Sequence, residues 1–293
     1  MGRFINLGLL PVSGGVLINE AGQVLFIAEV VVENPFLRYS GIFRSDDEAL
    51  VEIVRSGQMT PSGNGTFGSL LLTVAAMNDV GEAAFVVGLD DTALERADNV
   101  GVFRGDGTQM IEIVRRSDFL PDRDGRFLDI AAPIALNNSG QVLFAASISA
   151  TAPGTDVGLF LGDGTTLTPV VRLGDAVPGG DRVIAGFDNS IALNNEGQVV
   201  FKSPIDLQDG GSSNDGLGLF LYDPVAGLVC IARTGDMFPN MGAITDLDFQ
   251  SGLLFLGDEE SGLNDQGQAA YRFTADGNFG IAIWPGLPAP VMP

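Results

Sequence analysis

The chain has 293 residues, of which 45% are apolar, and it contains 40 glycines and 15 prolines. Its 37 acidic residues against 15 basic ones leave a formal charge of −22, which repels phosphate backbones and anionic lipids and argues against nucleic acid as a partner. The absence of histidine excludes Ser-His-Asp and Cys-His catalysis and any histidine metal ligand.

Strands and tight turns are predicted along the whole chain, because short runs of Val, Ile, Leu and Phe are broken by Gly, Asn and Asp. No window has the apolar spacing of an amphipathic helix. The apolar run from Val24 to Val32 is interrupted by Glu29, so we expect no membrane insertion. The first ten residues lack the apolar stretch of a signal peptide, and we expect neither a leader nor an anchor in this chain.

One motif, Asn-x-x-Gly followed by an alternating strand, recurs five times and defines the organisation of the chain. Its copies begin at intervals of 59, 59, 57 and 70 residues, at Asn19, Asn78, Asn137, Asn194 and Asn264. We therefore predict one domain over residues 1–293 with five repeats, approximately 17–76, 77–135, 136–192, 193–262, and 263–293 together with 1–16.

Four strands are predicted in each complete repeat. After the Asn motif comes a Gly-x-Phe landmark, and then a β-branched run that ends in arginine 14 or 15 residues later, a spacing that fits a hairpin. A last stretch is led by phenylalanine and runs into the next Asn motif. The glycines of the second landmark are Gly41, Gly101, Gly158 and Gly218, with a degenerate copy at Gly280; the arginines are Arg55, Arg115, Arg172 and Arg233; the last stretches begin at Phe67, Phe127, Phe187 and Phe249.

Repeats of four short antiparallel strands predict an all-β fold, a five-bladed β-propeller of four-stranded blades. Gly2-Arg3-Phe4 lines up with Gly125-Arg126-Phe127, which opens a last strand, and the fifth repeat lacks that strand. We therefore expect Phe4 to Val16 to pair with the last blade and close the ring. A string of β-sandwich modules and an open array of hairpins are the alternatives.

The motif Asn-x-x-Gly-x-Val-x-Phe and the trailing Arg-x-Gly-Asp with proline resemble the choice-of-anchor tandem-repeat proteins over nearly the whole chain. The resemblance implies a bacterial protein at the cell surface or outside the cell. The chain departs from that pattern in the second and fifth copies, where Ala83 and Ala269 replace valine.

Acidic residues supply the only candidates for a metal site or for catalysis. Asp122 and Asp124, with Asp129 nearby, place oxygen ligands at alternating positions as calcium loops do, but the full spacing and the terminal Glu are missing, so a polar turn is favoured. No other cofactor is expected. Asp129, Asp188 and Asp248 recur near the last strand of three repeats, and that regularity argues for a structural role.

The repeat arginines are followed three residues later by an acid or an amide, at Gln58, Asp118, Asp175 and Asp236. A hydrogen bond or ion pair that holds the following loop is favoured over a ring of charges around a channel, because the feature recurs in every complete repeat. Cys230 lies among Leu228, Val229 and Ile231, and we interpret it as a core thiol.

We predict a non-catalytic exported or surface module that binds a glycan or a protein, or acts as a spacer, and that is a monomer. The alternative is a carbohydrate-active enzyme, a glycosidase or a lyase of the five-bladed type. A glycosidase needs two convergent carboxylates about 5–10 Å apart. Recognition is expected on the variable segments, which run from Glu33 to Ser40, Asp90 to Asn99 and Asp206 to Asp215.

Overall fold

A computed structural model describes residues 3–8, 16–33, 35–46, 49–71, 73–122, 124–149, 156–180, 182–188, 190–207, 216–249 and 262–288. Most of the variable segment from Asp206 to Asp215 lies outside these residues. Within them, the only helical element is a short 3-10 turn, η1 (Glu95–Ala97), and everything else regular is β-strand. The predicted all-β class is therefore confirmed.

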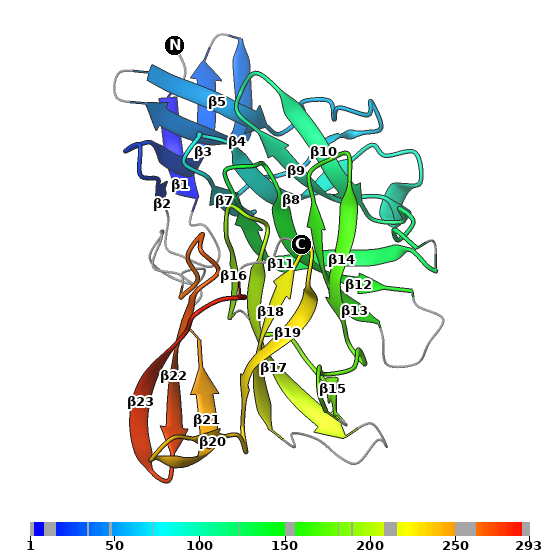
Figure 1. Cartoon of the computed structure of the whole chain (residues 1–293). Helices are drawn as coiled ribbons and strands as arrows, with labels where there is room; N and C mark the ends of the chain where they lie inside the picture. Colours follow the sequence, from blue (N-terminus) through cyan, green and yellow to red (C-terminus); the bar gives the residue numbers. More distant parts are fainter. Residues whose placement is uncertain are drawn as a thin grey trace, which may run out of the picture. The chain divides into compact units, whose positions relative to one another are not determined.

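The strands form antiparallel sheets built on a four-strand pattern, as predicted, and Figure 1 shows each sheet as a group of adjacent strands in chain order. The strand that precedes the Asn motif and pairs with the strand after it is the innermost strand of each sheet, and in three sheets, the first, second and fourth, it comes in two pieces. The first sheet holds β1 (Arg3–Gly8), β2 (Val16–Ile18), β3 (Val24–Glu33), β4 (Phe36–Asp46) and β5 (Ala49–Arg55); the second holds β6 (Thr66–Phe67), β7 (Val74–Met77), β8 (Ala83–Asp90), β9 (Val100–Gly105) and β10 (Met110–Arg115).

The later sheets repeat this order. The third consists of β11 (Phe127–Leu136), β12 (Val142–Ile148), β13 (Val157–Gly162) and β14 (Leu167–Arg172). The fourth consists of β15 (Arg182–Ile184), β16 (Ile191–Leu193), β17 (Val199–Leu207), β18 (Leu217–Asp223) and β19 (Gly227–Arg233). The fifth consists of β20 (Met237–Phe238), β21 (Gly242–Asp248), β22 (Ala269–Ala275) and β23 (Asn278–Trp284).

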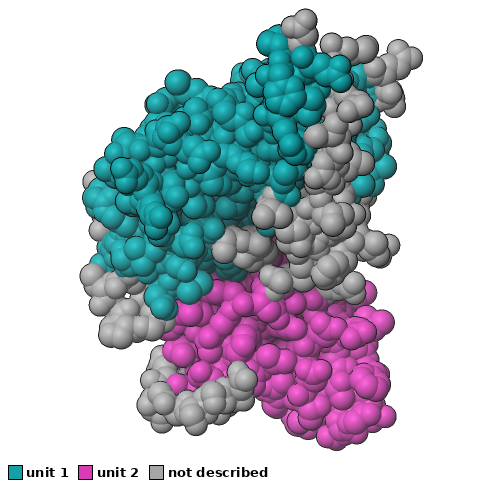
Figure 2. Space-filling view, turned by 180° about the vertical axis from the view of Figure 1, so that it is seen from behind, with its two compact units in different colours: residues 1–169, 254–258 teal, residues 170–253, 259–293 magenta. Residues whose placement is uncertain are grey.

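The chain divides into two compact units, residues 1–169 with 254–258 and residues 170–253 with 259–293, which are coloured separately in Figure 2. The boundary falls inside β14. The first unit contains the first two sheets and most of the third, and the second unit contains the fourth and fifth sheets.

The predicted closing strand is wrong. In the described part of Phe4 to Val16, β1 pairs with β3 of the first sheet, with Arg3 opposite Val31 and Gly8 opposite Ile27. The short β2 pairs with the beginning of the same strand. The physical reason is that β3 is ten residues long and its free edge accepts both pieces, so the first sheet takes its innermost strand from the residues that precede its own Asn motif. The closed five-bladed ring stays a prediction.

The two aromatic landmarks of a repeat face each other across two neighbouring strands. Phe85 lies directly opposite Phe103, and their rings stack with centroids 6.0 Å apart. Gly101 makes room for this pair, because a Cβ there would lie 2.8 Å from the Phe103 ring. Stacked pairs recur in three more sheets, at Phe26 and Phe43, Phe144 and Phe160, and Phe201 and Phe220.

Neighbouring sheets within a unit pack face to face, with one face of a sheet against the aromatic face of the next. Ile42 of the first sheet shares a core with Phe85 and Phe103 of the second. In the second unit, Leu219 shares a core with Phe273. Burial of such faces is the main source of stability in a repeat fold.

The Asn motif joins successive sheets as well as making a turn. Asn78 accepts a hydrogen bond from Glu82 N at its Oδ1 (2.8 Å), and its Nδ2 donates to the carbonyl oxygen of Asn137, the next copy of the motif (3.0 Å). Asn19 donates to the Asn78 carbonyl, and Asn194 to that of Asn264. The turn requires the motif's glycines, whose φ angles lie between 73° and 85° at Gly22, Gly81, Gly140, Gly197 and Gly267.

Candidate functional site

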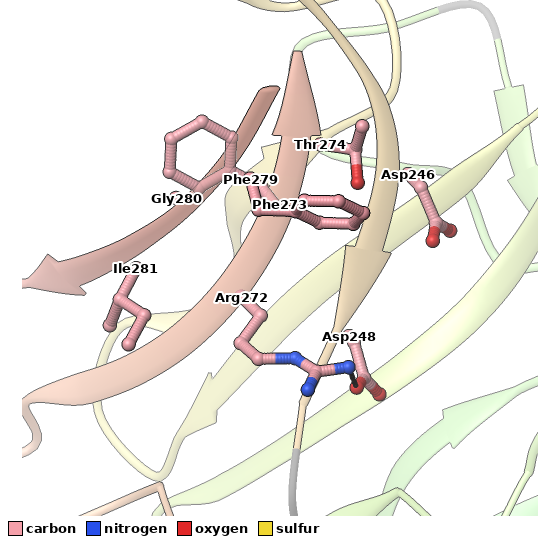
Figure 3. Close-up of a pocket in the computed structure, with 8 residues that line it drawn as sticks. All are labelled: Asp246, Asp248, Arg272, Phe273, Thr274, Phe279, Gly280 and Ile281. Atoms are coloured by element: carbon pink, nitrogen blue, oxygen red, sulfur yellow. Dashed lines mark hydrogen bonds and ion pairs between the residues drawn. The ribbon is translucent and has the colours of Figure 1, made fainter. Parts of the chain in front are cut away.

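A shallow pocket of about 420 Å³ lies on one face of the fifth sheet, within the second unit (Figure 3). The register places its side chains in rows across the sheet, because Asp248 lies opposite Arg272, and Arg272 lies opposite Ile281. A second row runs from Asp246 through Thr274 to Phe279. Strand pairing, rather than closeness in sequence, therefore assembles the pocket.

The polar part of the pocket is an ion-pair network. Arg272 Nη2 lies 2.7 Å from Asp248 Oδ2, as the dashed line in Figure 3 marks. The other Asp248 oxygen lies 3.9 Å from Nζ of Lys202, the single lysine of the chain, and Lys202 also contacts Asp188 at 3.2 Å. The Arg272–Asp248 pair is exposed, and such a pair contributes only about 0–1 kcal/mol to stability, so its role is to orient charged groups.

The apolar part of the pocket is unusually open. Phe279 and Ile281 are 88% and 77% exposed, and Ile283 on the same side of β23 is 69% exposed. Large apolar side chains gathered on one open face mark surfaces that bind a ligand or a partner. The pocket therefore combines an exposed aromatic ring with carboxylates and a guanidinium group.

Two of the predicted acidic candidates belong to this network, since Lys202 lies close to both Asp188 and Asp248. Asp129 lies in the first unit, on β11, where its Oδ1 accepts a hydrogen bond from Ile130 N (3.0 Å). Asp122 Oδ1 accepts a hydrogen bond from Asp124 N (3.1 Å), as a polar turn requires. Among the described residues, no group of three or more His, Cys, Asp or Glu side chains is arranged to hold a metal ion. Calcium binding at Asp122, Asp124 and Asp129 is the less favoured interpretation of the sequence, and it stays an alternative to the polar turn.

The acids that follow the repeat arginines act locally. Asp118 Oδ2 accepts a hydrogen bond from the backbone N of Arg115 (2.7 Å), and Asp236 does the same for Arg233 (3.0 Å). The bond recurs between Asp175 and Arg172, and Gln58 replaces the acid at Arg55. This agrees with the loop-holding role that the sequence predicted.

Sequence reasoning missed Arg272 and Phe279, although a signal for the site was present. The residue after the motif aromatic is apolar in the first three repeats, where it is Ile27, Val86 and Ala145. In the last two repeats it is a cation, Lys202 and Arg272. A structural feature recurs in every repeat, whereas this change of charge is confined to one unit and indicates a specific role.

Cys230 on β19 is a free, half-buried thiol, and we expect it to react slowly. Burial, and secondarily the charge of Asp236, raise the pKa of the Cys230 thiol to about 11. Only the thiolate is alkylated, so iodoacetamide at pH 8 should react about 100-fold more slowly than with an ordinary thiol. Mass spectrometry over time measures this rate, and unfolding in guanidinium should restore it. Equal rates in the folded and unfolded protein would contradict the prediction.

The fold is thus an all-β chain of repeated antiparallel sheets with a polar-aromatic pocket on the last one. Residues 13–291 match a family of unknown function, DUF7453, and the chain belongs to this family. No curated protein matches the chain. No helix within the described residues is long and apolar enough to cross a membrane.

Several solved structures are similar in fold at low sequence identity. AtxE2 isopeptidase in its apo form is 11% identical with a TM-score of 0.37, over 96% of this chain and 46% of that one, so the chain spans about half of its length. The β-propeller domain of the Trilobed protease from Pyrococcus furiosus is 9% identical with a TM-score of 0.36, over 98% and 83% of the two chains. The α-L-arabinanase of Penicillium chrysogenum, complexed with arabinobiose, is 13% identical with a TM-score of 0.38, over 97% and 84%.

Proposed function

We propose that the chain is a non-catalytic binding module and that the pocket on its fifth sheet binds a carbohydrate. The observation that carries the proposal is the exposed ring of Phe279 beside the Arg272–Asp248 pair. An aromatic ring packs against the C–H face of a sugar, while carboxylates and a guanidinium group bind its hydroxyls. The resemblance to the choice-of-anchor tandem-repeat proteins supports a setting at the cell surface or outside the cell.

The ion pairs favour binding over glycoside hydrolysis. The Asp248 carboxylate is engaged by Arg272 and faces Lys202. A glycosidase needs one carboxylic acid that carries a proton for the leaving group, and a second carboxylate across the bond. Asp248 therefore suits the orientation of a ligand better than proton transfer.

A glycan array probed with the purified chain, combined with a polysaccharide hydrolysis screen, tests the proposal. We expect at least one glycan to bind without turnover, and Phe279→Ala and Arg272→Ala each to weaken that binding by roughly tenfold or more. The control is Phe36→Ala, which removes another ring, 75% exposed, from the first unit. This variant should leave glycan binding unchanged. Turnover of a glycan would overturn the non-catalytic assignment, and binding insensitive to Phe279→Ala would exclude this pocket.

A further inference from the structure

The fifth sheet has an open edge. In the other four sheets the strand that carries the Gly landmark is covered on its outer side by a further strand, β5, β10, β14 or β19. The pairing is regular, because the landmark glycine lies opposite the repeat arginine, as Gly41 does with Arg55 and Gly101 with Arg115. Among the described residues, no strand pairs with β23 on this side.

The β23 edge lacks the features that normally protect an edge strand. Its seven residues, Asn278–Trp284, include neither a charged residue nor proline, and they pair with β22 without a bulge. Natural proteins commonly protect edge strands with charges, prolines or bulges. An unprotected edge in a chain with a formal charge of −22 is therefore suited to accept another strand.

The side chains of β23 support the same conclusion. Ile281 occupies the position that Ile42, Val102 and Leu219 occupy in other repeats, one residue after the landmark glycine. Those three side chains are 0%, 0% and 1% exposed, whereas Ile281 is 77% exposed. Ile42 is covered by its own outer strand and by the second sheet, since it shares a core with Val54 of the former and Phe85 of the latter, whereas Ile281 has neither kind of cover among the described residues.

We propose that β23 accepts an extended segment of a partner protein as an additional antiparallel strand. The outer strands of the complete sheets define its chemistry: six or seven residues, mostly apolar, that end in an arginine, which would lie opposite Gly280. Charge complementarity favours a basic segment over an acidic one, because the chain is strongly acidic and Asp246 and Asp248 lie on the same sheet. The proposal goes beyond carbohydrate binding, since strand addition uses the backbone edge of β23 and the pocket uses side chains on its face.

Trp284, the single tryptophan of the chain and the last residue of β23, reports directly on this edge. The probe is a synthetic peptide with the sequence of residues 109–116, Gln-Met-Ile-Glu-Ile-Val-Arg-Arg, which reproduces β10 with one flanking residue on each side. We expect a saturable change in Trp284 fluorescence when this peptide is titrated into the full chain. A peptide with proline in place of its valine, the counterpart of Val114, which pairs directly with Val102 in the second sheet, cannot complete the hydrogen-bond ladder and should bind at least tenfold more weakly. A peptide with both arginines changed to glutamate should also lose affinity.

Matched protein variants locate the binding site. Ile283→Lys changes a 69% exposed residue of β23 that does not line the pocket, and it should weaken peptide binding at least tenfold, because it removes apolar contact and repels the basic peptide. Val225→Lys introduces the same charge at a 96% exposed position on the turn between β18 and β19, in the same unit, and should leave binding unchanged. Thermal unfolding of both variants checks that they remain folded.

Three outcomes would overturn the proposal. The first is no fluorescence response to the peptide, and the second is equal binding of the proline-containing peptide. The third is a dimer in analytical ultracentrifugation that Ile283→Lys dissociates, which would assign the edge to a second copy of the chain. The glycan array does not decide among these outcomes, so failure of carbohydrate binding and failure of strand addition can be distinguished.

Discussion

Phe103→Ala is expected to lower the free energy of unfolding by about 3–5 kcal/mol, the cost of removing a large aromatic side chain from a packed core. Phe103 is fully buried, packs edge-on against Phe67 with centroids 4.8 Å apart, and stacks on Phe85. Its loss leaves a cavity between the first and second sheets. Guanidinium unfolding followed by circular dichroism measures the effect.

The matched control is Phe36→Ala, which removes the same ring from a 75% exposed position on β4. This variant should change the free energy of unfolding by less than about 0.5 kcal/mol. If the two substitutions had similar costs, the aromatic cluster would not be a source of stability.

Asn78→Ala should cost about 2–4 kcal/mol, although it removes only a small polar side chain. The Asn78 side chain is buried and makes hydrogen bonds to the backbone and side chain of Glu82 and to the Asn137 carbonyl. Each such bond contributes about 1 kcal/mol, and a buried carbonyl left without a partner costs about 1–3 kcal/mol more. Thermal or chemical unfolding measures the loss.

Asn264 provides the comparison within the same chain. It makes the equivalent local bonds to Gln268, but its residue is exposed. Asn264→Ala should therefore cost about 1 kcal/mol or less. Equal costs at Asn78 and Asn264 would show that the bond to the next motif contributes nothing.

Most of the secondary structure could be predicted because the same pattern of strands and turns recurs in five copies of the repeat. The alternation after each Asn motif and the fixed interval from Gly101 to Arg115 predicted strands that the structure contains. The alignment of Phe4 with Phe127 was also useful, because both residues lie at the start of an innermost strand that pairs with the strand after the next Asn motif.

The sheet to which β1 belongs could not be predicted in the same way. The sequence has an extra strand before the first Asn motif and lacks a strand in the last repeat. This pattern suggested that the extra strand would complete the last sheet. Hydrogen bonding follows the nearest available edge instead, and the residues of β1 precede Asn19 by a short distance along the chain.

The candidate site was predicted only in part. Asp188 and Asp248 could be identified as recurring acids, but their connection through Lys202 depends on the packing of the fourth sheet against the fifth. Arg272 and Phe279 became part of the site through the register of β22 with its neighbours on both sides. The spacing of residues along the sequence does not fix that register. A shift of one residue would turn every side chain of the strand to the opposite face of the sheet.

The hydrogen bond from one motif asparagine to the carbonyl of the next has a consequence for how such chains lengthen. The donor and the acceptor of this bond belong to the same residue type at the same position of the repeat. A duplicated repeat therefore carries both the side-chain donor and the carbonyl acceptor that link it to its neighbours. Gene duplication can therefore extend the array without any new residue at the junction, and selection then acts on the terminal units, where the array stops.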